Sequence, residues 1–301
     1  MPTSPTISVV TPVLNRHDTI AAAIESVSSQ SVPALEHIVV DGGSRDGTLD
    51  VLRRYPHLTT SSGPDAGIYD ALNKAIAKAR GDFILHLNAD DLLAPSALAA
   101  IVAAARSNPS ADAICGGAML VDMAGNHVAD LTGPRFRQSD FDAVLLGSPI
   151  INARVFRRGA HERVGQYDTR YPLLADRDFL VRARLAGIAS VEIDATLYIY
   201  RQHPSSATFD PRNRNAAVMS EEFLRLAADW LGRTDAPAAL RRVCRIRYGR
   251  SVITLARLGA AHGGRRDALL FTPEARLSLA PAANAAMAIF AWVKNEPHAR
   301  P

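Results

Sequence analysis

Apolar residues in the first part of the chain follow two alternating spacings. Short runs rich in β-branched and apolar residues, which are typical of buried strands, occupy positions 7–12, 36–40, 58–60 and 83–87. Between the runs, apolar residues recur every three or four positions, as Ile68, Leu72 and Ile76 do, which indicates helices that pack on one face. The alternation predicts a β-α-β-α-β-α-β succession, and hence an α/β fold with a mostly parallel central sheet flanked by helices.

The same two spacings continue beyond the fourth run and predict elements up to about residue 205. We expect a helix around 98–102, a strand over 113–117, a hairpin with strands at 119–122 and 127–129, a helix over 176–185 and a strand over 191–200. After about residue 215 only helical signals remain. We therefore expect a domain over residues 1–215 and a helical C-terminal extension over residues 216–301.

Composition is that of an ordinary soluble globular protein. The 301 residues are 48% hydrophobic and 21% charged, so the chain can bury a substantial core. Cys115 and Cys244 lie far apart and have no metal-binding spacing, which predicts two reduced thiols. The chain start lacks the charged and apolar regions of a signal peptide, and the apolar stretch 277–293 is short for a membrane span. We therefore expect a cytoplasmic protein.

Positive charge is concentrated in the C-terminal part of the chain. Eight arginines follow one another with almost no acid between them, namely Arg241, Arg242, Arg245, Arg247, Arg250, Arg257, Arg265 and Arg266. Such a cluster favours nucleic acid or an anionic membrane surface as a partner, and it can equally be a solvated helix face. No nucleic-acid recognition motif accompanies it, so we expect no nucleic-acid binding. A peripheral contact with the inner face of the plasma membrane is the partner that we retain.

The run at 83–87 ends abruptly in Asn88, Ala89, Asp90 and Asp91. Carboxylates at the end of a buried strand are costly unless a cation or hydrogen bonds compensate their charge. At the carboxyl end of a parallel strand they would lie in the crevice where open α/β sheets bind ligands, and their oxygens suit Mg²⁺ or Mn²⁺. The alternative is that Asp90 or Asp91 caps the helix that follows. These residues alone leave both interpretations open.

Three further polar loops follow predicted strands or open predicted helices. They are Thr11-Pro12-Val13-Leu14-Asn15, Asp41-Gly42-Gly43-Ser44-Arg45-Asp46-Gly47-Thr48 and Pro64-Asp65-Ala66-Gly67-Ile68-Tyr69-Asp70-Ala71-Leu72-Asn73-Lys74. Together with residues 88–91, these motifs resemble the family 2 inverting glycosyltransferases over about residues 5–205, in the branch that reads PDxGIYDAxNKG…GDxxxxLNADD. The resemblance implies the GT-A fold, a nucleotide-diphosphate sugar donor and a divalent metal. Members of that branch build cell-surface polysaccharides and glycolipids.

The resemblance also implies roles for individual residues of the donor site. Asp41 matches the residue that recognises the base, usually uracil, with an Asp-Gly turn as the alternative. Many relatives carry a second acid where this chain has Gly42. Asn88 and Asp90 match the Asp-x-Asp signature, so we assign Asn88 to the ribose and Asp90 to the metal. Asp91 is expected to support these residues or to contact the donor sugar.

The same motifs contribute further residues to the donor and metal sites. His203 lies in a late R-x-H-x-x-S loop and is expected to help bind Mg²⁺ or Mn²⁺, with a purely structural role as the alternative. Asp70 and Lys74 are expected at the donor, although they share a helix face and could form a solvated ion pair. The other residues expected at the donor are Thr11, Pro12, Asn15, Gly43, Asp65, Gly67, Asn73, Ala89 and Arg201.

An inverting transfer needs a base that takes the proton of the acceptor hydroxyl. In the family this base is an acid that precedes a helix, and the matching stretch here is Leu174-Ala175-Asp176-Arg177-Asp178. The resemblance assigns the base to Asp176, with Asp178 as the second candidate, and Ala175 stands where many relatives have Glu. From spacing alone, both acids would instead be helix-capping residues without chemistry.

These motifs predict an inverting glycosyltransferase that moves a sugar from a nucleotide-diphosphate donor to a hydroxyl of a glycan or lipid-linked acceptor. UDP is expected before GDP or dTDP as the nucleotide. One alternative is a sugar-nucleotide-forming nucleotidyltransferase, but residues 11–16 lack the glycine-rich, basic loop that such an enzyme needs after its first strand. Another alternative is a non-catalytic nucleotide-binding protein of the same fold. The sugar, the acceptor and the oligomeric state stay open.

Overall fold

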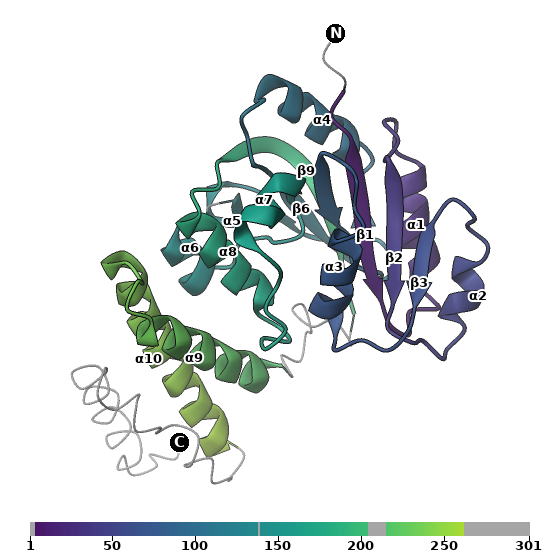
Figure 1. Cartoon of the computed structure of the whole chain (residues 1–301). Helices are drawn as coiled ribbons and strands as arrows, with labels where there is room; N and C mark the ends of the chain where they lie inside the picture. Colours follow the sequence, from purple (N-terminus) through teal and green to yellow (C-terminus); the bar gives the residue numbers. More distant parts are fainter. Residues whose placement is uncertain (1–3, 138, 204–214, 262–301) are drawn as a thin grey trace. The chain divides into compact units, whose positions relative to one another are not determined.

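Nine strands form one sheet in the first part of this computed structural model, which describes residues 4–137, 139–203 and 215–261 (Figure 1). The strands are β1 (Ile7–Val13), β2 (Glu36–Asp41), β3 (Thr59–Ser62), β4 (Phe83–His86), β5 (Leu92–Leu93), β6 (Ala113–Asp122), β7 (His127–Leu131), β8 (Arg154–Arg157) and β9 (Ser190–Gln202). Their order is β3-β2-β1-β4-β8-β6-β9-β5, with β7 paired to β6. The expected parallel pairing of the first four strands is confirmed, since β2 pairs in parallel with β1 and β3, and β1 with β4.

The sheet is mixed, because short strands of opposite direction interrupt the parallel ones. β8 is antiparallel to β4 and β6, and β5 is antiparallel to β9. The sequence pattern missed β5 and β8, since two and four residues are too few to show a periodicity. β6 and β7 form the expected hairpin. β6 also pairs in parallel with β9, so that β9 ends at the same edge of the sheet as β1, β2 and β4. We call this edge the site edge.

Eight helices accompany the sheet in the described part of the first unit. They are α1 (Ile20–Ser28), α2 (Thr48–Leu52), α3 (Ile68–Ile76), α4 (Ala97–Ser107), α5 (Pro134–Arg137), α6 (Phe141–Leu146), α7 (Arg158–Val164) and α8 (Ala175–Leu185). α3 lies across β1 and β2 on one face of the sheet, and α1 and α2 lie on the other face (Figure 1). β1 is buried at every position and forms the centre of the core between these layers.

The face that α3 buries differs from the expected one. Ile68 is 42% exposed, whereas Tyr69, Leu72 and Asn73 are buried. The buried face is therefore rotated by about one residue from the line through Ile68, Leu72 and Ile76. An asparagine can occupy a buried face only if its amide finds partners, and Asn73 has two, described below.

The chain divides into two units, residues 1–211 and 212–301. The described part of the second unit consists of α9 (Ala216–Gly232) and α10 (Ala238–Ala261), which pack against one another through buried residues such as Phe223, Trp230 and Val243. Within the described ranges, no helix combines the length and the apolar character that crossing a membrane requires. The apolar stretch 277–293 lies outside the described residues. Both cysteines are buried and free, as the sequence predicts.

Candidate active site

The loops after β1 and β2 are tied together at the site edge. Asn15 has a positive φ of 51°, which turns the chain so that its backbone N–H donates to Ser44 Oγ at 2.8 Å. Its side-chain oxygen accepts a hydrogen bond from the backbone N–H of Arg45 at 2.9 Å. The next residue, Arg16, donates its backbone N–H to Thr48 Oγ1 at 2.9 Å. These bonds fix the backbone of the loop, and so they fix the position from which the Arg16 side chain extends.

Asp90 is the point at which segments from three parts of the sequence meet. Its Oδ2 accepts a hydrogen bond from Arg16 Nε at 3.2 Å and lies 3.2 Å from His203 Nε2. Arg16 follows β1, Asp90 follows β4 and His203 follows β9, so all three are brought together because these strands end at the same edge. The two residues predicted to bind metal, Asp90 and His203, are therefore neighbours. Arg16 was not among the predicted site residues, although a basic residue in a strand-end loop is a signal for anion binding.

Asp91 lies inside the protein, directly behind Asp90. Its carboxylate is 4% exposed and accepts hydrogen bonds from Tyr198 Oη at 2.8 Å, the Arg201 backbone N–H at 2.9 Å and Asn88 Nδ2 at 3.1 Å. Burial, and then the charge of Asp90, raises the pKa of Asp91 to about 7. Asp91 thus fastens the loop after β4 to β9. Of its two expected roles, this geometry fits support of the site and not contact with a sugar.

Arg201 and Ala89 are also held within the chain. The Arg201 guanidinium donates from Nε to the Asp90 carbonyl at 2.5 Å and from Nη2 to the Thr19 carbonyl at 3.3 Å. Burial lowers the pKa of Arg201, and the charges of Asp91 and Asp90 oppose this shift. Ala89 is buried. Both residues shape the loop that presents Asp90.

Asn88 is the member of this loop with an unused acceptor. Its backbone N–H donates to Tyr198 Oη at 3.0 Å and its Nδ2 donates to Asp91. Its Oδ1 is buried and makes no hydrogen bond with the described residues, and the same is true of His86 Nε2 nearby. Burial lowers the pKa of His86 to about 4, against the opposing effects of Asn88 and Asp90. The Asn88 side chain is therefore placed between Asp91 and His86, in the loop that also carries Asp90.

Asp41 and Asp65 lie on either side of Gly42. The Asp41 carboxylate is only 1% exposed and accepts hydrogen bonds from the N–H groups of Gly43 and Ser44 at 3.0 and 3.1 Å, and from Ser62 Oγ at 2.6 Å. Asp65 is half-buried, and a Cβ on Gly42 would lie 2.6 Å from its Oδ2. Its Oδ1 accepts from the Gly67 N–H at 3.0 Å, where Gly67 has a φ of 110°. The carboxylate that faces outward at this position is therefore that of Asp65, and Asp41 holds the loop.

Thr11 and Pro12 are within β1 and not in the loop that follows it. The sequence pattern ended this strand at the proline, but β1 continues to Val13, and Pro12 pairs with Val40. Thr11 is fully buried and its Oγ1 lies 2.9 Å from His37 Nε2. Both residues are buried, so the expected contact of Thr11 and Pro12 with a donor stays a prediction, and these side chains do not make such a contact from the surface.

The polar side chains of α3 point either to the surface or into the protein. Asp70 and Lys74 form an ion pair of 2.8 Å at the surface, and the hydrogen bond from Lys74 is the main cause that lowers the pKa of Asp70. Asp70 also accepts the Ala66 N–H at 3.0 Å, so the pair stabilises the loop before the helix. The Asn73 amide instead exchanges two hydrogen bonds of 2.9 Å with the backbone of Tyr167. Asn73 was expected at the donor, but both ends of its amide are occupied by the chain.

The two candidate bases have different surroundings at the start of α8. Asp178 is 6% exposed and forms an ion pair with Arg182 Nε at 2.7 Å. Asp176 is half-buried and accepts the backbone N–H of Arg177 at 2.6 Å. Its charge acts on the hydroxyls of Tyr69, Tyr167 and Tyr200, whose pKa values are raised mainly by burial. Neither acid is the N-cap, which is Leu174. Asp176 is therefore the acid that remains near the surface.

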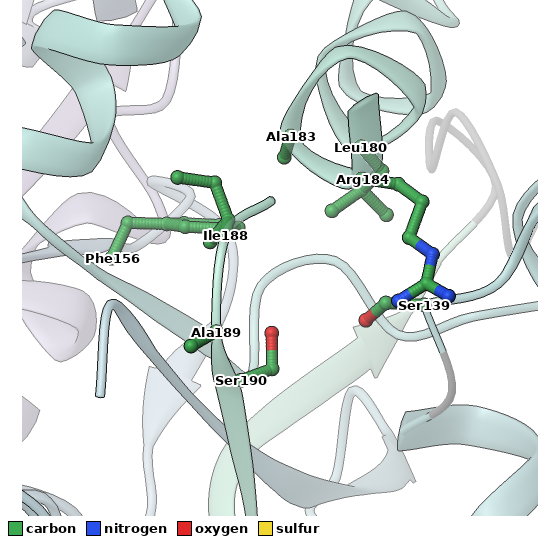
Figure 2. Close-up of a pocket in the computed structure, with 8 residues that line it drawn as sticks. All are labelled: Ser139, Phe156, Leu180, Ala183, Arg184, Ile188, Ala189 and Ser190. Atoms are coloured by element: carbon green, nitrogen blue, oxygen red, sulfur yellow. The ribbon is translucent and has the colours of Figure 1, made fainter. Parts of the chain in front are cut away.

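A pocket of about 200 Å³ lies at the opposite edge of the sheet and is separate from these residues. Figure 2 shows Leu180, Ala183 and Arg184 of α8 on one side of it, with Phe156 and Ser190 among the residues facing them. Phe156 and Ser190 both align with Ala113, the first residue of β6, so they lie where the parallel strands begin. No residue assigned to the donor, the metal or the base lines this pocket.

Within the described residues, no three His, Cys, Asp or Glu side chains converge in a way that could hold a metal ion by themselves. Asp90 and His203 provide a carboxylate oxygen and an imidazole nitrogen only. Magnesium and manganese sites in enzymes that act on phosphates commonly use one or two protein ligands and complete their shells with phosphate and water. The donor set therefore fits such an ion when a diphosphate is bound with it.

Comparison with known proteins identifies the family. The family model described as "Glycosyl transferase family 2" matches residues 8–165. A curated Mycobacterium bovis protein named "PGL/p-HBAD biosynthesis glycosyltransferase" is 32% identical over 186 residues, which are 60% of this chain and 70% of that protein.

Solved structures of other glycosyltransferases share the fold. The structure of S. aureus TarS 1-349 in complex with UDP-GlcNAc has a TM-score of 0.56 at 19% identity, over 94% of this chain and 80% of that one. The mannosyltransferase PcManGT from Pyrobaculum calidifontis, in complex with GDP-Man and Mn²⁺, has a TM-score of 0.57 at 19% identity, over 97% and 84% of the two chains. These likenesses confirm the expected GT-A-like α/β fold. The family model covers more than half of the chain, and the protein is a glycosyltransferase that belongs to glycosyl transferase family 2.

Proposed function

We propose that this enzyme transfers a sugar, with inversion, from a nucleotide-diphosphate donor to a hydroxyl of a glycan or lipid-linked acceptor. The observation that carries the proposal is the convergence of Asp90, His203 and Arg16 at the site edge. A carboxylate, an imidazole and a guanidinium together suit a diphosphate and its counter-ion. UDP is the nucleotide proposed first. The TarS and PcManGT complexes with UDP-GlcNAc and GDP-Man support a sugar nucleotide as the ligand class.

Asn88 and Asp65 are the proposed contacts of the nucleoside. Asn88 lies two residues before Asp90 in the loop after β4, and its amide is of the kind that can meet a ribose hydroxyl. Asp65 lies against Gly42 and has one oxygen held by the Gly67 N–H. Its other oxygen can accept the N–H of a pyrimidine or purine base. Asp41, which was expected in that role, supports it by fixing the loop that contains Gly42 and Gly43.

Asp90 and His203 are the residues that would hold Mg²⁺ or Mn²⁺. When bound, the ion would neutralise the negative charge that develops on the departing nucleoside diphosphate. Arg16 Nε lies 3.2 Å from the same Asp90 oxygen, so its guanidinium is close enough to contact a phosphate bound there. Asp91 holds the loop that carries Asp90 against β9 through its hydrogen bonds to Tyr198 and Arg201.

Asp176 is the proposed base. It lies at the start of α8, where the helix N-terminus favours the carboxylate form that can accept a proton. Its carboxylate accepts the Arg177 N–H and is the group that takes up the proton of the acceptor hydroxyl. Asp178 is committed to Arg182 and holds the helix in place.

The acceptor is proposed to be presented at a membrane. Six arginines and no acid occur along α10. Arg241 donates to backbone carbonyls, and Arg247 lies over the Phe223 ring. The other four arginines are exposed, namely Arg242, Arg245, Arg250 and Arg257. A basic face of this kind is attracted to anionic lipid headgroups. The relative named for PGL/p-HBAD biosynthesis supports a glycolipid acceptor class.

Calorimetric titration with a panel of UDP-, GDP- and dTDP-sugars in Mn²⁺ tests the donor site. We expect one nucleotide to bind the wild-type enzyme, and the Kd to rise at least about tenfold in Asp90→Asn, as for other losses at metal sites. Asp50→Asn, on the exposed surface of α2, is the matched control and should bind normally. Equal binding by Asp90→Asn and wild type would contradict the metal and diphosphate assignment.

A further inference from the structure

The segment before α8 leads directly into the first turn of the helix, which carries the proposed base. Leu174 is the N-cap and has no side-chain capping bond, whereas Asp176 within the first turn accepts the Arg177 N–H. The segment 165–174 that leads to it contains Tyr167, Tyr171 and Leu173, and its position depends on what it packs against. Two side chains of α3 contact it directly, and both belong to the GIYDAxNK motif that begins this helix.

Asn73 fixes the middle of the segment. Its Nδ2 donates to the Tyr167 carbonyl and its Oδ1 accepts the Tyr167 N–H, both at 2.9 Å. An amide that meets both polar groups of one residue imitates a strand partner and fixes the backbone in position and in orientation. Asn73 is buried, so water does not compete with these bonds.

Tyr69 fixes the end of the segment. Its hydroxyl donates to the Leu173 carbonyl at 3.2 Å, and a backbone hydrogen bond with Asp176 opposes the rise that burial causes in its pKa. Its ring packs on Tyr167 with centroids 5.3 Å apart, and Tyr167 packs on Phe179 of α8 at 4.8 Å. The tyrosine therefore contacts both the residue before the N-cap and the backbone of Asp176 itself.

We propose that Tyr69 and Asn73 are positioning residues that hold Asp176 in its catalytic place, and that they do not contact the donor. This inference rests on the proposed role of Asp176 as the base. α3 starts immediately after the loop that contains Asp65 and Gly67, so the same helix sets both the nucleoside side of the site and the carboxylate that acts on the acceptor. A shift of about 1 Å in such a group can lower the rate of the chemical step about 100-fold.

Tyr69→Phe tests the hydroxyl while it keeps the ring packing. Release of nucleoside diphosphate is measured with the sugar nucleotide that the binding panel identifies. We expect kcat to fall about tenfold and the KM and calorimetric Kd for the donor to stay at the wild-type values, because only the base is displaced. Asn73→Ala removes both bonds to Tyr167 and should lower kcat further. An unchanged calorimetric stoichiometry for UDP would show that the variants are fully folded.

Tyr55→Phe and Asn108→Ala are matched controls, since their side chains bond to Glu25 and to the Ala104 carbonyl, away from the proposed site. Both should keep the wild-type kcat. A wild-type kcat in Tyr69→Phe, or a raised Kd for UDP with kcat unchanged, would overturn the inference. Failure of the base assignment is distinguishable, because Asp176→Asn would then keep its turnover whatever Tyr69→Phe does.

Discussion

At the scale of single residues, Gly42 leaves room for the carboxylate of Asp65, the proposed contact of the base. Many relatives carry a second acid next to the residue that matches Asp41, and this chain has glycine there. A Cβ at this position would come within 2.6 Å of Asp65 Oδ2, so the glycine makes room for an acid that arrives from another loop. We propose that Asp65 supplies the acid at this place, where relatives have one next to the residue that matches Asp41.

Gly42→Ala should displace the Asp65 carboxylate and weaken donor binding. We expect the Kd for UDP to rise about tenfold, which corresponds to the loss of one hydrogen bond to a charged group. Calorimetric titration measures this directly. Gly63→Ala is the control, since a Cβ there would meet no atom within 4 Å. If Gly42→Ala binds UDP as tightly as wild type, Asp65 is not a base contact.

His161 is buried among the rings of Phe156, Tyr167 and Phe179, and burial lowers its pKa to about 4. The unfolded chain takes up a proton at this histidine below its ordinary pKa near 6.5, and the folded protein does not. Stability from this group is therefore complete above about pH 6.5 and is lost as the pH falls toward 4.

His161→Phe should make stability less sensitive to acid. The free energy of unfolding is measured in urea at pH 7.5 and at pH 5.5. From the higher to the lower pH it should decrease by about 1.4 kcal/mol less in the variant than in wild type, because the variant lacks the one histidine that is protonated only in the unfolded chain. His57→Phe, at a position exposed to solvent, should leave the difference between the two pH values as it is in wild type. An unchanged pH dependence in His161→Phe would contradict the assignment of a neutral buried histidine.

At the scale of elements, the long and periodic parts of the fold were predictable and the short ones were not. β1, β2, β4 and β9 have enough apolar residues to define them, and their common edge gathers Asp90, His203 and the loops. β5 and β8 are too short to produce a pattern. The buried face of α3 was misjudged because Asn73 is polar, and only its two bonds to Tyr167 explain its burial.

The candidate site was predictable where its chemistry follows from a motif in one loop. The roles proposed for Asp90 and Asp176 come from such motifs and stay predictions. Roles that depend on burial were not predictable, since a sequence does not show that Asp41 is covered by Ser62 or that Asp91 bonds to Tyr198. Arg16 was missed for a related reason: its proximity to Asp90 depends on the pairing of β1 with β4.

The exposed arginines of α10 should mediate contact with anionic lipid. We expect the full chain to sediment with vesicles that contain phosphatidylglycerol and not with neutral vesicles, because the attraction amounts to about 1 kcal/mol per arginine near the surface. Arg245→Gln with Arg257→Gln should weaken sedimentation severalfold. Arg53→Gln with Arg54→Gln, both exposed in the first unit, changes the net charge equally and should have little effect. Equal weakening by both pairs would indicate a general charge effect instead.

At the scale of the whole molecule, the first unit contains the sheet, the site edge and the start of α8, and hence every group that the proposed reaction uses. Two helices organise this unit around the site. α3 supports the nucleoside loop and the segment before the base, and α8 presents Asp176 while Asp178 and Arg182 anchor it. Family membership fixes the class of reaction, and these contacts supply a physical role for most of the motif residues.

The central claim is that Asp176 removes the proton of the acceptor while the donor is held at Asp90. Its most direct test is the release of nucleoside diphosphate by Asp176→Asn and Asp178→Asn, measured together with the calorimetric Kd for UDP. We predict that Asp176→Asn lowers kcat by about 1,000-fold with an unchanged Kd, as expected for loss of a general base. Asp178→Asn should keep most of its turnover. Wild-type turnover in Asp176→Asn, or its abolition in Asp178→Asn alone, would contradict this account.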